Sequence, residues 1–262
     1  MPPLLKRHSL VSKALEIEDR EIIALTGAGG KTSLMFQLAR ELQAAGPVIT
    51  TATTKIAEPD ASQSPSFLLT REDPHWEHNC RQRLQRLRHV TLAHYRFGGG
   101  KIKGPEGEEM EQLLRLDLAP YVVIEADGAR KKPLKAPRHD EPLIPGQSTL
   151  VIGLIGWDIL GRELTESNVH RAEIFRRTLG LAGTHVTLSE EILARWAWHP
   201  AGLGKNVPPA ARFVVFLNKC DSDDSRDQAV RLASTIVCAA GSPCRHVVVG
   251  SLRQGLYLSI QL

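Results

Sequence analysis

The sequence predicts a doubly wound, mostly parallel α/β sheet carried by one domain over residues 1–262. Short apolar runs of strand length alternate with amphipathic stretches almost from end to end, which is typical of strand-helix-strand units. Two of the runs, Tyr121–Ala126 and Thr149–Ile155, are nearly continuous, as expected for strands covered on both faces of a sheet. The chain is 42% hydrophobic and 24% charged, a globular composition that excludes disorder, collagen-like repeats and a coiled coil.

The first half of the chain contains a strand-helix-strand pattern followed by shorter segments. Glu21–Leu25 is apolar and predicts a strand, and Lys31–Ala44 places Leu34, Leu38 and Leu42 on one helical face. Gly46-Pro47 ends that helix, and the β-branched run Val48–Thr53 predicts the next strand. Further short strands are expected at Ser66–Leu69 and His89–Ala93, with a basic helix between them at Trp76–Arg88.

The second half continues the alternation after a glycine-rich loop at Phe97–Gly107 and a helix at Glu108–Leu116. Residues 156–209 contain no apolar strand, and we expect them to form a helical insertion or cap on the sheet. The remaining predictions are helices at Val169–Thr178, Ser189–Trp198 and Ser225–Ala239, a strand at Arg212–Leu217, and a last strand at His246–Val249.

Charge and cysteine content narrow the function classes. The 33 Lys and Arg against 29 Asp and Glu give a net charge of +4, too weak to predict nucleic-acid binding. The four cysteines form no CxxC pair, no apolar stretch reaches the length of a membrane span, and the first residues lack a secretory apolar region. These features predict a cytoplasmic protein that does not enter membranes.

Thr26–Thr32 (TGAGGKT) lies between a predicted strand and a predicted helix and is the strongest motif. Glycines let backbone N–H groups approach a phosphate, and the helix N-terminus adds further donors. Lys31 is expected to reach the β- and γ-phosphates and Thr32 to bind Mg²⁺. The full motif has glycine where this chain has Leu25, so the loop is short, similar in length to that of Mur-type ligases. The nucleotide-binding residues expected here are Gly27, Ala28, Gly29, Gly30, Lys31, Thr32 and Ser33. The alternative is a glycine-rich turn with a surface lysine.

Val122–Gly128 (VVIEADG) is an apolar strand that ends in two acids and a glycine. In phosphate-loop proteins a carboxylate at the end of a neighbouring strand helps to hold Mg²⁺. We therefore expect Glu125 to bind Mg²⁺ together with Thr32, and Glu125, Asp127 and Lys31 to be the catalytic residues. The alternative is a solvated turn.

Asn218-Lys219-Cys220-Asp221 directly follows a predicted strand. An aspartate there can accept hydrogen bonds from guanine N1–H and N2–H₂, which adenine does not offer. Lys219 would cover the purine, Asn218 would brace the loops, and Ser251 in Gly250-Ser251-Leu252 would add a base contact after the last strand. The alternative assigns Asp221 as the N-cap of the following helix.

Three further constellations keep two interpretations each. The hydroxyls of Thr50–Thr54 either reach Mg²⁺ or a phosphate, or only fill a strand. The basic residues Arg130–Lys132, with Lys135 and Arg138, either bind an anion or form a solvated loop. His170-Arg171 either serves the γ-phosphate or caps a helix.

The order of the three main motifs resembles the SIMIBI class of phosphate-loop GTPases, and Glu125–Gly128 is similar to the Glu-x-x-Gly element of its metallochaperone-type members. More specifically, the chain resembles the YqeC family of selenium-dependent hydroxylase accessory proteins. The matching stretches are Gly27–Phe36, Thr50–Ile56, Glu125–Pro137, Glu141–Pro145, Asn168–Phe175, His199–Pro208 and Leu217–Asp221. The resemblance implies an accessory role in the maturation of molybdenum-containing hydroxylases, with a client metalloenzyme or a cofactor-maturation protein as partner.

The sequence thus predicts a protein that binds GTP and Mg²⁺ and acts as a slow GTPase. Two alternatives remain open: an ATP-dependent kinase or ligase-like enzyme, favoured by the short loop, and a nucleotide-sensing module that does not hydrolyse its ligand.

Overall fold

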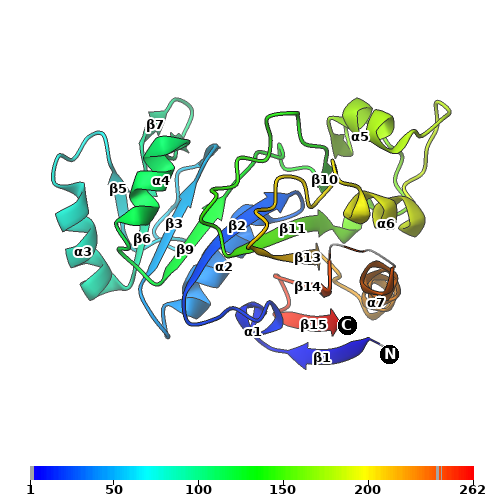
Figure 1. Ribbon diagram of the computed structural model, residues 1–262, viewed down its shortest axis with the longest axis horizontal. Helices are drawn as coiled ribbons and strands as arrows, with labels where there is room; N and C mark the ends of the chain where they lie inside the picture. The colour runs from blue at the N-terminus through cyan, green and yellow to red at the C-terminus, as the bar shows by residue number, and fades with distance from the viewer. Residues whose placement is uncertain (1–2, 240–241, 243) are drawn as a thin grey trace.

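The computed structural model of the protein describes residues 3–239, 242 and 244–262. A ten-stranded sheet crosses the molecule in the order β1-β15-β14-β13-β11-β2-β9-β3-β6-β5 (Figure 1). Its strands are β1 (Leu4–His8), β2 (Glu21–Gly27), β3 (Val48–Ala52), β5 (Phe67–Leu69), β6 (His89–Ala93), β9 (Tyr121–Glu125), β11 (Leu150–Gly156), β13 (Arg212–Asn218), β14 (His246–Ser251) and β15 (Leu256–Gln261). Neighbouring strands are parallel from β14 to β5, whereas β15 is antiparallel to both β14 and β1.

Helices cover both faces of the sheet, as the doubly wound prediction requires. The helices are α1 (Val11–Ala14), α2 (Lys31–Leu42), α3 (Trp76–Leu87), α4 (Glu108–Arg115), α5 (Ala172–Leu179), α6 (Glu190–Trp198) and α7 (Asp223–Cys238), with a 3-10 turn at Trp157–Ile159. On one face α1 and α2 pack on alternate residues of β2, β3, β9 and β13, such as Val123 and Phe216. The residues between them, such as Val122 and Val215, face α3 and α4 at one end of the sheet and α5–α7 at the other. The mostly parallel α/β fold predicted from the sequence is therefore confirmed.

Two small sheets lie outside the large one. β4 (Lys55–Ala57), β7 (Tyr95–Phe97) and β8 (Lys101–Lys103) form a three-stranded antiparallel sheet, and β10 (Leu134–Lys135) pairs with β12 (Val169–His170). Residues 97–107 are thus not a plain loop, because Gly98–Gly100 make the turn of a β-hairpin, with Gly99 and Gly100 at positive φ.

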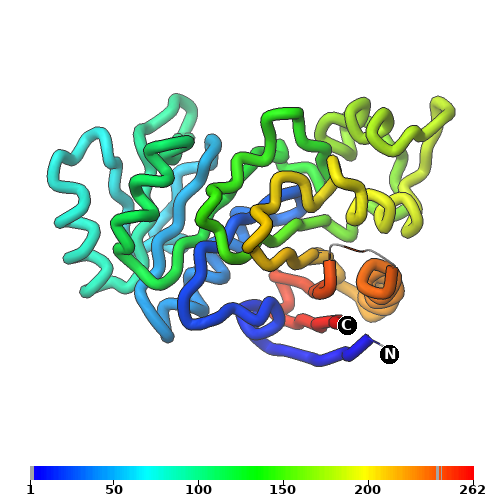
Figure 2. Tube along the Cα trace, in the orientation of Figure 1, coloured from blue at the N-terminus to red at the C-terminus, as the bar shows by residue number. Residues whose placement is uncertain are grey.

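Two further predictions need correction. His246–Val249 is not the last strand, because β15 follows it and pairs with β1, so both ends of the chain lie at one edge of the sheet (Figure 2). The predicted helix at Val169–Thr178 starts at Ala172, since Val169 and His170 belong to β12. Residues 156–209 hold α5 and α6, and their Phe175 and Trp196 share one apolar core with α7 and β13. Within the described residues no helix is long and apolar enough to cross a membrane.

Candidate functional site

The predicted site residues meet at the carboxyl edge of the sheet. The parallel strands β14, β13, β11, β2 and β9 are neighbours, and their last residues are Ser251, Asn218, Gly156, Gly27 and Glu125. In open α/β sheets this edge is where ligands bind. The three main motifs, which lie between Thr26 and Asp221 in the sequence, therefore share one surface.

The glycines of the loop between β2 and α2 are required by both conformation and space. Gly27, Gly29 and Gly30 have φ of 81°, 92° and 126°, which side-chain-bearing residues rarely adopt. A Cβ on Gly29 would lie 2.2 Å from the Gly156 nitrogen, and one on Gly30 would lie 2.6 Å from Asn218 Nδ2. The loop therefore packs directly against the ends of β11 and β13. Leu25 is a buried residue of β2 that pairs with Glu125, so the missing first glycine reflects a strand that continues further than in the full motif.

Lys31 begins α2 and is buried under the loop. Its Nζ donates to the Gly27 carbonyl at 2.8 Å and lies 3.1 Å from Asp127 Oδ1 and 3.8 Å from Glu125 Oε1. Burial by itself would lower the pKa of Lys31, but the charges of Asp127 and Glu125 outweigh it and the pKa is raised. Lys31 is therefore a cation in the folded protein, held between two carboxylates.

Thr32 and Glu125 form a second contact across the two strands. The Thr32 hydroxyl donates to Glu125 Oε2 at 2.7 Å. Burial raises the pKa of Glu125 despite the opposing effects of Lys31 and the Thr32 hydrogen bond. Two of the oxygen groups predicted to bind Mg²⁺ are thus adjacent. In the described part of the chain no group of three or more His, Cys, Asp or Glu side chains is arranged to hold a metal.

The residues predicted to contact a base line one groove of about 400 Å³ next to the phosphate loop. Asn218 links the two regions, because its Nδ2 donates to the Gly29 carbonyl at 2.8 Å and its Oδ1 accepts from the Leu252 N–H at 3.2 Å. The groove is lined by Gly30, Ser33, Asn218, Lys219, Asp221, Ser251, Leu252 and Arg253. Of the predicted phosphate-loop residues, Gly30 and Ser33 therefore also border the predicted base site.

Asp221 faces this groove and is not a helix cap. The N-cap of α7 is Ser222, which exchanges hydrogen bonds with Ser225 in a capping box. The Asp221 carboxylate accepts from the Ser251 hydroxyl at 2.6 Å and pairs with Arg253 at 3.0 Å. The capping interpretation of Asp221 is therefore wrong.

Several residues at this edge were not predicted from the sequence. Asp158, in the turn after β11, accepts a hydrogen bond from Lys219 at 2.9 Å and so holds that lysine beside the groove. Arg253 follows Ser251 and contacts Asp221. An acid after a strand and an arginine near the Gly-Ser-Leu turn were the available signals, but neither belongs to a recognised spacing.

The basic residues that were predicted to bind an anion or to cap a helix differ in their exposure and in their partners. Arg130 and Lys131 are exposed, whereas Lys135 is buried and pairs with Asp127 and Glu141. Arg171 is the N-cap residue of α5 at φ 65°, and its guanidinium binds Glu141 and the Ala136 carbonyl. The arginine is thus engaged by protein groups. The Thr51 and Thr53 hydroxyls are buried at the end of β3 and have no hydrogen-bond partner among the described residues, so filling the strand does not account for them fully.

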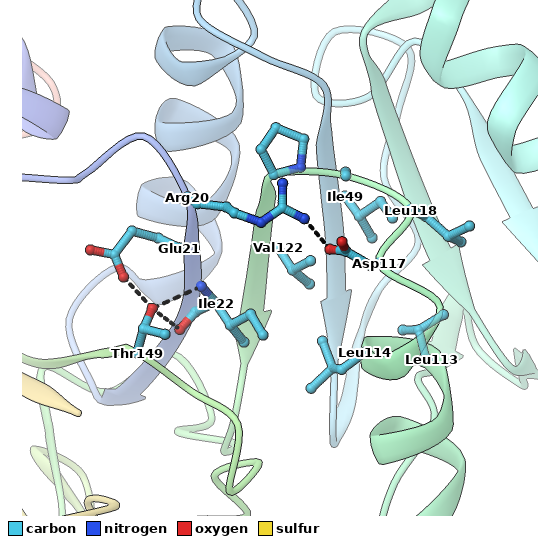
Figure 3. Close-up of a pocket in the computed structure, with 12 residues that line it drawn as sticks. Arg20, Glu21, Ile22, Ile49, Leu113, Leu114, Asp117, Leu118, Val122 and Thr149 are labelled. Atoms are coloured by element: carbon cyan, nitrogen blue, oxygen red, sulfur yellow. Dashed lines mark hydrogen bonds and ion pairs between the residues drawn. The ribbon is translucent and has the colours of Figure 1, made fainter. Parts of the chain in front are cut away.

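A separate pocket of about 150 Å³ lies at the opposite edge of the sheet, beside the first residues of β2 and β9 (Figure 3). Among the residues that line it, Arg20 and Asp117 form an ion pair. The Thr149 hydroxyl donates to the Glu21 carboxylate and accepts from the Ile22 N–H. None of the predicted site residues lines it. The candidate site is therefore the groove at the carboxyl edge.

Comparison with known proteins gives two matches. A family model described as YqeC protein matches residues 23–173, which include the phosphate loop, both acids after β9 and the Lys135–Arg171 region. The chain is also 36% identical over 207 residues to a protein of Escherichia coli (strain K12) described as "Uncharacterized protein YqeC". That alignment covers 76% of this chain and 75% of the relative. No solved structure gives a significant match.

Proposed function

This chain belongs to the YqeC family, and on that premise, together with the geometry of the groove, we propose that it is a magnesium-dependent GTP-binding protein with slow GTPase activity. We propose further that it acts as an accessory factor in the maturation of selenium- or molybdenum-dependent hydroxylases, with a client metalloenzyme or cofactor-maturation protein as partner. The observation that carries the nucleotide proposal is the single groove that joins Gly30 and Ser33 of the phosphate loop to Asp221 and Ser251.

The phosphates would bind to the N–H groups of Gly29 and Gly30 and to the N-terminus of α2, where backbone donors and the helix dipole favour anions. The N–H groups of Gly27 and Ala28 already donate to Asp127 and to the Leu154 carbonyl. Lys31 lies at the first position of this helix and carries a full charge. On binding it would exchange the Gly27 carbonyl and Asp127 for phosphate oxygens. In this role it stabilises the negative charge that develops as the γ-phosphoryl group is transferred.

The donor set at Thr32 and Glu125 fits Mg²⁺. The ion prefers oxygen ligands, keeps several waters and is completed by substrate phosphates in most nucleotide sites. One hydroxyl and one carboxylate placed 2.7 Å apart match that pattern. When bound, the ion would neutralise charge on the phosphate oxygens.

Asp127 is the residue we assign to the attacking water. Glu125 accepts from the Thr32 hydroxyl, whereas Asp127 accepts from the Gly27 N–H and its Oδ1, 3.1 Å from Lys31 Nζ, accepts no hydrogen bond among the described residues. A carboxylate in this position accepts a hydrogen bond from water and orients its oxygen toward phosphorus. The bond to the leaving nucleoside diphosphate breaks as the bond to water forms, and the water proton that points at Asp127 passes to the inorganic phosphate that is released.

Base selection would depend on Asp221. A guanine entering the groove would replace Arg253 at the carboxylate and donate two hydrogen bonds, which adenine cannot do. The test is to measure binding of GTP, ATP and XTP to the wild type and to Asp221→Asn in the presence of Mg²⁺. We expect the wild type to prefer GTP and the variant to prefer XTP, because the asparagine amide matches the xanthine 2-oxo group. Equal affinities of the wild type for GTP and ATP would contradict guanine selection.

The short phosphate loop favours an ATP-dependent kinase or ligase-like enzyme as the second candidate function. A preference for ATP in the same titration would support it. Single-turnover measurements on the wild type and Lys31→Ala separate either enzyme from a nucleotide sensor, because a sensor binds the nucleotide but shows no turnover that depends on Lys31.

A further inference from the structure

Six buried or half-buried charges of alternating sign connect the phosphate loop to the first helix of the insertion. Each neighbouring pair in this chain is in contact, and the order is Glu125, Lys31, Asp127, Lys135, Glu141, Arg171. Three acids and three bases make the row neutral. Burial of unpaired charge is strongly unfavourable, so a change at one member alters the balance at the next.

Lys135 is the most deeply buried of the three cations. Its ammonium donates to the Gly128 carbonyl at 2.8 Å and to Glu141 Oε2 at 3.0 Å, and it forms an ion pair with Asp127 Oδ2 at 3.0 Å. Its side chain is 1% exposed, and its backbone is held in β10, where it pairs with His170 next to Arg171. Lys135 therefore cannot leave Asp127 without breaking three contacts.

Asp127 shares two cations in this arrangement, Lys31 at 3.1 Å and Lys135 at 3.0 Å. Under the proposed function a nucleotide draws Lys31 away to the phosphates. Asp127 is only 1% exposed, so a loss of Lys31 without a second cation would leave a buried carboxylate unpaired. This cost would oppose the movement of Lys31 to the phosphates. Lys135 remains in place because Glu141 and the Gly128 carbonyl also hold it.

We propose that Lys135 is a positioning residue that holds the Asp127 carboxylate in place as its second cation, so that Lys31 is free to move to the nucleotide phosphates. This inference rests on the proposed function, because it needs a triphosphate at the loop. Glu141 and Arg171 support this arrangement. Arg171 donates to both carboxylate oxygens of Glu141, and Glu141 in turn holds Lys135. The start of α5 is thereby connected to the phosphate site.

The test compares nucleotide binding and turnover in Lys135→Met, Asp127→Asn and the double variant. In Lys135→Met, Asp127 retains only Lys31, and we expect the Kd for a mant-labelled, non-hydrolysable GTP analogue with Mg²⁺ to rise about tenfold or more. Asp127→Asn in the same chain removes the carboxylate that holds Lys31, and we expect binding to return to within about threefold of the wild type while turnover stays lost. Lys131→Met, an exposed lysine of the same segment, is the matched control and should bind as the wild type does.

Each outcome decides the proposal. Unchanged binding by Lys135→Met overturns it, and so does a loss that Asp127→Asn fails to repair, because Lys135 would then act by another route. If Lys135→Met does not fold, the comparison of Asp127→Asn with the charge-balanced double variant replaces it: similar affinities support the proposal and a large difference contradicts it. If the wild type binds neither the GTP nor the ATP analogue, the proposed function fails instead, which is a separate result.

Discussion

Gly30 lies at the junction of the phosphate loop, α2 and Asn218. Its φ of 126° and the 2.6 Å that would separate an added Cβ from Asn218 Nδ2 leave no room for a side chain. Asn218 in turn ties the loop to Leu252 beside the predicted base site. A single methyl group at this position would therefore disturb both halves of the site.

We predict that Gly30→Ala lowers the free energy of unfolding by about 1–3 kcal/mol, through backbone strain and the displaced Asn218. Urea denaturation followed by circular dichroism measures this change. Gly128→Ala is the matched control, because a Cβ there meets nothing within 4 Å, and it should stay within about 0.5 kcal/mol of the wild type. Equal stability of the two variants would mean that the loop does not pack on Asn218 as described.

The ionisation of Glu141 is expected to have a clear effect on the free energy of unfolding. Burial by itself would raise its pKa, but the hydrogen bond from Arg171 and the charge of Lys135 outweigh this and lower the pKa to about 2. The folded pKa is thus below the ordinary value of 4.5, so the stabilisation is present above pH 4.5 and is lost as pH falls toward 2.

We therefore predict that the stability difference between the wild type and Glu141→Gln is largest near neutral pH and shrinks by about 3 kcal/mol as pH falls below the ordinary glutamate range. Urea unfolding of both proteins across this range provides the measurement. Parallel pH dependences for the two proteins would contradict the assigned ion pairs.

The strands of the sheet interior and the edge strand β5 were predictable from the sequence, whereas β1, β15 and the strands of the small outer sheets were not. The runs that became β9 and β11 are apolar on both faces and only five and seven residues long, which favours a buried strand over a helix. β1 is almost entirely exposed and β4, β7 and β8 have three residues each, so none carries a hydrophobic period long enough to recognise. β15 alternates between buried and half-buried residues, a pattern that is visible in hindsight at the very end of the chain.

The site followed the same division. Asn218 and Ser251 end recognisable strands, Lys31 and Asp221 follow such strands within a few residues, and parallel strands bring their ends to one edge. The pairing of Lys135 with Asp127 and of Arg171 with Glu141 depends instead on how β10 and β12 fold over that edge. Sequence reasoning could identify the basic residues but could not tell that Lys135 is buried while Lys131 is exposed.

Three of the four cysteine thiols are buried in the folded protein. Cys80, Cys220 and Cys244 are buried, and burial raises their pKa to about 12, 12 and 11, whereas Cys238 at the end of α7 is exposed. Thiolates are the reactive form, so buried cysteines of high pKa react slowly. We predict that a thiol reagent such as 5,5′-dithiobis(2-nitrobenzoate) modifies only Cys238 rapidly in the native protein and all four cysteines after denaturation. Rapid native modification of Cys220 would mean that the Asn218–Asp221 turn opens in solution.

We propose above that the carboxyl edge of the folded chain binds a nucleoside triphosphate with Mg²⁺. Isothermal titration calorimetry of GTP and ATP into the purified protein, with Mg²⁺ and again with an excess of EDTA, measures it most directly. We predict saturable binding of one GTP per chain, at least about tenfold weaker without the metal and absent in Lys31→Ala. If a protein shown to be folded gives no heat of binding with either nucleotide in the presence of Mg²⁺, the proposed nucleotide binding is contradicted.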